Sequence, residues 1–149
     1  MRTIITVLAA LPLLAVSSAQ AADAGFCQAF QPILDAAQQG FEPLRGEATA
    51  PGEWRATRSV PQAVDCQVYD AADQPAGKNY TCRLTIAGTT VDPAAADYAE
   101  AIRSCAEMEV FGLVDGVWYL RTKETGVQVS MIQMTHPEPY IDLVVYEAD

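Results

Sequence analysis

The chain has 149 residues, a length that suits one domain once a targeting segment is removed. Its 19 acidic and 9 basic side chains give a formal net charge of −10, which disfavours nucleic acid and anionic lipid head groups as partners. The same charge suits a basic partner or a divalent cation, although surface acidity more often serves solubility. Nothing after Ala22 is apolar and long enough to cross a membrane, so we expect no stable membrane anchor.

The N-terminus, MRTIITVLAALPLLAVSSAQA, is typical of a secretory signal peptide. Arg2 supplies the positive start, residues 4–16 form a short apolar run, and Ala19-Gln20-Ala21 is a small-x-small cleavage site. We therefore expect a signal peptide over 1–21 and a single domain over 22–149. A retained anchor is the alternative, which the small and polar residues after the run disfavour. The expected location is the periplasm, with extracellular release as the other possibility.

The first half of the expected domain begins with a helix. Apolar residues recur at helical spacing over 24–39, and Gly40 follows as a stop. The proline- and glycine-rich segment 41–54 is predicted to be a loop, and a strand is expected over 54–59. Alternating apolar residues then predict a β-hairpin with strands over 63–70 and 78–87.

The second half again begins with a helix and continues with strands. Asp92 is a good N-cap and Pro93 fits the first helical position. The apolar stripe of this helix is predicted to reach Met108. The helix itself is expected to end near Glu107. The dipeptide Asp115-Gly116 predicts a two-residue hairpin turn. Further strands are expected over 127–135 and 140–148, after a turn at 124–126.

The order helix, three strands, helix, then three or four strands predicts an α+β domain: a mostly antiparallel sheet with two helices packed on one face. This element order across the mature chain resembles the topology of the type III secretion chaperone fold. The resemblance implies a binding scaffold, often a dimer, so a homodimer is possible. An export signal and cysteines depart from those chaperones, which are cytosolic.

The four cysteines are all in the expected mature part, and no C-x-x-C is present. An even number in an oxidising compartment predicts two disulfides. Positions 66 and 82 are symmetric about the centre of the first hairpin, which favours Cys66–Cys82 and hence Cys27–Cys105 between the helices. The competing pattern joins each helix to the sheet, as Cys27–Cys66 and Cys82–Cys105.

Catalytic signatures are few. The chain has one histidine, His136, in the segment MTHPEPY, and it lacks the common hydrolase, P-loop, dinucleotide-binding and zinc-protease motifs. With Glu138 or Asp142, His136 could provide the acid–base pair of a small hydrolase or lyase. An exposed loop histidine is the more common situation.

A cation site is the other small-ligand hypothesis. Asp70 and Asp73 share the first hairpin loop with Asn79, but they lack the density of oxygen ligands that calcium prefers. Solvated turn acids are therefore the favoured interpretation. No metal and no cofactor are expected.

A surface for a partner is predicted on the sheet face that no helix covers. Trp118 and Tyr119 are neighbours on one strand, so their side chains point to opposite faces. One of the two rings should be in the core and the other on the open face, so Trp118, Tyr119 and Arg121 are the candidates for an interaction surface. The slightly favoured interpretation is that Trp118 is the core residue and Tyr119 an ordinary half-exposed one. The arginines Arg55, Arg58, Arg83 and Arg121 alternate with apolar residues and are expected to coat that face and pair with its acids.

Together these patterns favour an exported, disulfide-stabilised module that binds a protein or an envelope component, in the manner of an inhibitor, immunity protein or assembly factor. The two alternatives are the small periplasmic hydrolase or lyase that uses His136, and a binder of divalent cations or small ligands.

Overall fold

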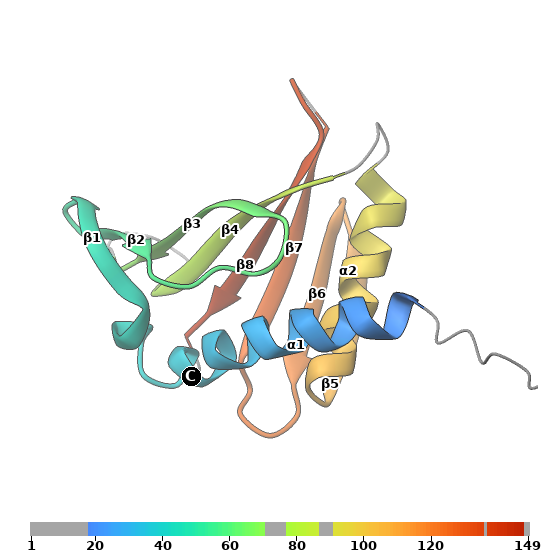
Figure 1. Ribbon diagram of the computed structural model, residues 1–149, viewed down its shortest axis with the longest axis horizontal. Coiled ribbons are helices and arrows are strands. Elements are labelled where there is room, and N and C mark those ends of the chain that lie inside the picture. The colour runs from blue at the N-terminus through green and yellow to red at the C-terminus, as the bar shows by residue number, and fades with distance from the viewer. Residues whose placement is uncertain (1–17, 71–76, 87–90, 136, 148–149) are drawn as a thin grey trace, which may run out of the picture.

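The computed structural model describes residues 18–70, 77–86, 91–135 and 137–147, and in these ranges it contains two helices and one eight-stranded antiparallel sheet (Figure 1). The predicted α+β fold class is confirmed. The elements are α1 (Ser18–Ala37), the short helix η1 (Glu42–Leu44), β1 (Arg45–Ala50), β2 (Glu53–Ala56), β3 (Ala63–Tyr69), β4 (Asn79–Thr85), α2 (Val91–Cys105), β5 (Met108–Val114), β6 (Val117–Thr122), β7 (Gln128–Met134) and β8 (Tyr140–Tyr146).

The sheet consists of two four-stranded meanders that meet in its middle. The strand order is β1-β2-β3-β4-β8-β7-β6-β5, so β4 pairs with β8 and the two meanders run outward from that pair. Each meander follows one helix in the chain. The edge strands β1 and β5 are therefore equivalent in topology, because each is the first strand of its meander.

The helix α1 buries one stripe against the sheet. Phe26, Phe30, Ile33, Leu34 and Ala37 are each at most 5% exposed, as their spacing predicts. The helix passes through Pro32 without a break, and it begins at Ser18, before the predicted start at residue 24. Residues 1–17 of the predicted signal peptide lie outside the described residues.

The helix α2 begins at Val91, one residue before the predicted N-cap Asp92, and ends at Cys105. Met108 does not continue its stripe, since this residue is the first of β5. The helix contacts β5 to β8, and α1 lies against α2, β4 and β8. No helix among the described residues is long and apolar enough to span a bilayer.

The segment 41–54, predicted to be a loop, contains η1 and most of a β-hairpin. The strands β1 and β2 are joined at Gly52, whose φ of 77° favours glycine. The predicted strand over 54–59 is shifted, because β2 ends at Ala56. Small and polar residues in β1 carry little β propensity, so tertiary contacts hold this strand. The Arg45 guanidinium lies 4.2 Å from the Trp54 ring centre and bonds Asp70 at 2.5 Å.

Both favoured disulfides are present. Cys66 lies directly opposite Cys82 in the β3–β4 register, and the two are bonded. Cys27 of α1 is bonded to Cys105 of α2. Because Cys82 pairs with Leu143 of β8, which in turn pairs with Met131 of β7, this row continues the fully buried core beneath the helices.

Candidate protein-binding surface

Exposed apolar side chains are concentrated at the β5 edge of the sheet. Six large apolar residues of the described chain are exposed, and five of them belong to β5 or to its neighbour β6. We call these five the β5 patch: Val110, Phe111, Leu113, Val114 and Tyr119. The sixth, Val64, lies apart on β3. Contiguous exposed apolar surface of this kind is typical of an interaction site.

The patch wraps around both faces of the edge strand. Leu113 pairs with Trp118, which pairs with buried Met131, so Leu113 points to the face that carries the helices. Val114 pairs with Val117, whose row continues through Ile132 on the open face. The register shifts between Val110 and Gly112, and this bulge changes the alternation of β5.

A hollow of about 380 Å³ lies on the open face beside the patch. It is lined by Phe111, Tyr119, Leu120, Arg121, Gln128, Val129 and Tyr146. The Ser130 hydroxyl donates a hydrogen bond to the Tyr146 hydroxyl at 2.9 Å, and Arg121 Nε donates to the carbonyl of Gly126 at 3.2 Å. Two aromatic rings and a guanidinium beside an exposed Phe111 form the kind of anchor surface found at protein interfaces.

The strand β5 is also an edge of the sheet with free backbone groups. It pairs with β6 on one side, and residues 108–114 make no backbone hydrogen bond to any other described strand or loop. The opposite edge, β1, has the sequence RGEATA and exposes no large apolar side chain. The two edges are equivalent in topology, so the fold itself does not require an apolar β5.

Acidic side chains flank the apolar part of β5. Glu107 and Glu109 lie at its start and Asp115 lies in the turn at its end, and all three are exposed. None of them takes part in an ion pair with another described residue. The patch therefore lies between acids at both ends of the strand.

The predicted pairing of arginines with acids on the open face holds for Arg83. Its Nε lies 3.5 Å from a carboxylate oxygen of Asp142, and its guanidinium lies 4.2 Å from the ring centre of Tyr140. Desolvation raises the pKa of Asp142, and the Arg83 charge only partly opposes this effect. Arg55 is exposed on β2, whereas Arg58 lies beyond β2 and is not part of a strand.

The predicted acid–base group is not assembled by the described residues. His136 lies outside them, Glu138 is exposed in the loop before β8, and Asp142 pairs with Arg83. For the cation hypothesis, Asp73 also lies outside the described residues. Asp70 bonds Arg45, and no group of three potential metal ligands occurs in the described part of the chain.

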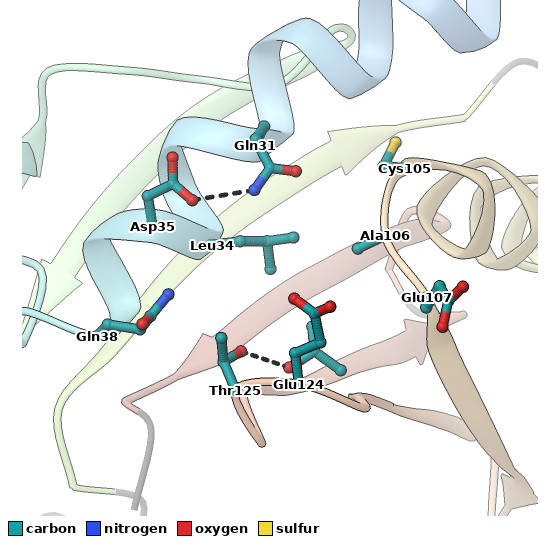
Figure 2. Close-up of a pocket in the computed structure, with 10 residues that line it drawn as sticks. Gln31, Leu34, Asp35, Gln38, Cys105, Ala106, Glu107, Glu124 and Thr125 are labelled. Carbon is teal, nitrogen blue, oxygen red and sulfur yellow. Dashed lines mark hydrogen bonds between the residues drawn. The ribbon is translucent and has the colours of Figure 1, made fainter.

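A second hollow, of about 240 Å³, lies on the helix side. Figure 2 shows it between α1, the start of β5 and the β6–β7 turn, with Gln31 donating to Asp35 at 2.9 Å. Its acids, Asp35, Glu107 and Glu124, come from three separate segments. The described lining has no histidine and no free cysteine.

Sequence reasoning located part of this surface. Tyr119 is 43% exposed on the open face and Arg121 lies beside it, as expected, whereas Trp118 is half-buried on the helix side. The four β5 residues of the patch were not predicted from the sequence: Val110, Phe111, Leu113 and Val114. The run VFGLV offered a signal, because a strand that is apolar on both faces must be either central in a sheet or an exposed apolar edge.

No protein-family model matches this chain, and neither the curated proteins nor the solved structures give a match.

Proposed function

We propose that the protein is an exported binding module that recognises a protein or an envelope component through the β5 patch. The observation that supports this most strongly is the concentration of exposed apolar side chains on one edge of the sheet, while the equivalent edge at β1 has none. Hydrophobic surface costs solubility when it stays in water, so a contiguous patch is typical of a surface that a partner covers.

The proposed site of action is the periplasm, with extracellular release as the alternative. Two disulfides suggest an oxidising environment. The apolar N-terminal run and the Ala19-Gln20-Ala21 sequence support export through a signal peptide. A scaffold for binding is also what the resemblance of element order to type III secretion chaperones implies.

The proposal is tested by comparing three baits in one capture experiment on solubilised envelope extract: the oxidised wild-type protein, Phe111→Ser and Val64→Ser. Phe111 and Val64 are exposed to similar fractions, 62% and 65%, so Val64→Ser controls for the loss of an exposed apolar side chain outside the patch. A component held by the β5 patch should be recovered with wild-type protein and Val64→Ser and lost with Phe111→Ser.

Recovery of the same components with all three baits would show that the patch is not the binding surface. If no component is captured, and both the wild-type protein and Phe111→Ser turn over a substrate, the protein is an enzyme and the proposal is wrong.

A further inference from the structure

We propose that β5 binds its partner by strand addition: an extended segment of the partner pairs with the free edge of β5 and becomes a ninth strand of the sheet. The segment is a run of about five apolar residues flanked by lysine or arginine, a length set by the usual size of strands. This inference rests on the proposed function, since it specifies how the β5 patch is covered.

The backbone of β5 is suited to such pairing. Its outer N–H and C=O groups bond no other described strand or loop, whereas its inner side pairs with β6 on both sides of the bulge. An edge of this kind is a template for a further strand, and natural proteins usually protect it with charges or proline inside the strand. From Val110 to Val114, β5 contains neither a charge nor a proline, so Glu109 at its start and the bulge after Val110 are its protection.

The side chains of β5 specify an apolar partner. Val110 and Leu113 are 41% and 50% exposed on the helix side, and Val114 is 57% exposed on the open face. A strand beside β5 would place successive side chains against these residues on both faces. Its core must therefore be apolar at consecutive positions and not only at alternate ones, which distinguishes it from an amphipathic strand.

The charges of the edge specify the flanks of the partner segment. Glu107 at one end and Asp115 at the other have no described ion-pair partner, and Glu109 lies opposite Arg121 in the β5–β6 register without forming an ion pair with it. Basic residues on both sides of an apolar core would meet these acids in either strand direction. The net charge of −10 adds a long-range attraction for a basic segment.

The same charges disfavour the two central registers of a pair of β5 strands, and the net charge disfavours a second copy of this chain in any register. An antiparallel pair of β5 strands with its two-fold axis at Gly112 places Glu109 of each copy opposite Asp115 of the other. An axis at Phe111 places Glu107 opposite Asp115 instead. Like charges directly opposite one another destabilise a strand pair, and two chains of charge −10 repel at long range.

The test measures binding of synthetic peptides to the full oxidised protein by fluorescence anisotropy. The probe has five β-branched or aromatic residues between paired lysines. Two control peptides keep the core, one with glutamate flanks and one with N-methylated core amides, which keeps the side chains but removes the backbone donors. Strand addition predicts binding of the probe and a loss of at least about tenfold in affinity for each control.

Protein variants test the location. Leu113→Lys puts a charge on the apolar edge and should weaken probe binding at least about tenfold, while Val64→Lys should leave it unchanged. Glu109→Gln and Asp115→Asn should each weaken it by roughly two- to fivefold at low salt, and less at high salt. Glu47→Gln on β1, an exposed acid of the opposite edge, is the matched control.

Equal binding of the N-methylated peptide, or equal binding to Leu113→Lys, would overturn strand addition. If the probe fails to bind while Phe111→Ser still loses its envelope component, strand addition is wrong and the patch remains a binding surface. A dimer in sedimentation velocity that Leu113→Lys dissociates would assign the edge to a second copy. If neither probe nor envelope component depends on β5, both proposals fail.

Discussion

Cys27 and Cys105 join the two helices by a disulfide that spans 78 residues of sequence, with their Cα atoms 4.8 Å apart. The bridge connects the helix of the first meander to the helix of the second. It therefore links the two halves of the chain in the helix layer, as the β4–β8 pairing links them in the sheet. Cys66–Cys82 is different, because it joins two strands that are already paired within the first meander.

We predict that replacing both Cys27 and Cys105 by alanine lowers the free energy of unfolding by about 4 kcal/mol, because a long closed loop restricts the unfolded chain most. The change is measured by urea unfolding of the oxidised proteins. Cys66→Ala with Cys82→Ala is the comparison: its shorter loop predicts about 3 kcal/mol from the same effect. A loss below about 1 kcal/mol for the helix bridge would contradict its structural role.

Tyr80 is fully buried, and its hydroxyl donates a hydrogen bond to the carbonyl of Arg58 at 3.0 Å. Tyr80→Phe keeps the ring but leaves this carbonyl without its donor, so we expect a loss of about 1–2 kcal/mol in the free energy of unfolding. Tyr119→Phe, on an exposed ring, should change it by less than about 0.5 kcal/mol. Equal effects in urea unfolding would show that the buried bond contributes nothing.

Burial also raises the pKa of Tyr80. An acid whose pKa is higher in the folded state makes folding less favourable once the pH exceeds its unfolded value, here 10.0. The stability of the wild type relative to Tyr80→Phe should therefore fall above pH 10. A constant difference between pH 8 and 11, followed by urea unfolding, would contradict this titration.

Local signals predicted much of this fold because they agree with the tertiary contacts. The alternation around Cys66 and Cys82 placed both on one face, and their symmetric positions implied the register that the β3–β4 pair adopts. Asp115 and Gly116 both have positive φ, at 50° and 79°, as the two-residue hairpin requires. At these sites, turn chemistry and apolar pattern favour the same structure.

Other features depend on contacts between residues far apart in the chain. β1 was missed because its alanine and glycine residues carry no β signal. Its position depends on Arg45 contacting Trp54 and Asp70. The β5 patch was only partly predicted for a similar reason. A run such as VFGLV indicates a strand, but strand order alone decides whether that strand is central or, as here, at the edge.

The Arg83–Asp142 pair provides a pH test. Desolvation raises the pKa of Asp142 above 3.8, so the folded state holds its proton to a higher pH than the unfolded chain does. Stability associated with this residue is therefore present below pH 3.8 and lost as the pH rises through the folded pKa. Asp142→Asn removes this loss. The free energy of unfolding of this variant should therefore increase relative to that of the wild type as the pH rises from 3.5 to 7.

The measurement combines urea unfolding at several pH values with an NMR titration of the Asp142 carboxyl group. Arg83→Met provides the control, because removing the cation should raise the pKa of Asp142 further. A carboxyl that titrates below 3.8 would mean that the ion pair outweighs desolvation, and the expected gain for Asp142→Asn would then become a loss.

The β5 patch should be detectable without any partner. Phe111→Ser removes its largest exposed apolar side chain, at 62% exposure, and should change the free energy of unfolding by less than about 0.5 kcal/mol. It should clearly reduce the fluorescence of a dye that binds apolar surface, since the patch is contiguous. Val64→Ser removes a side chain of similar exposure that stands alone, so the dye signal should hardly change. Equal reductions for the two variants would mean that the five residues do not act as one surface, and a large loss of stability in Phe111→Ser would mean that Phe111 supports the fold.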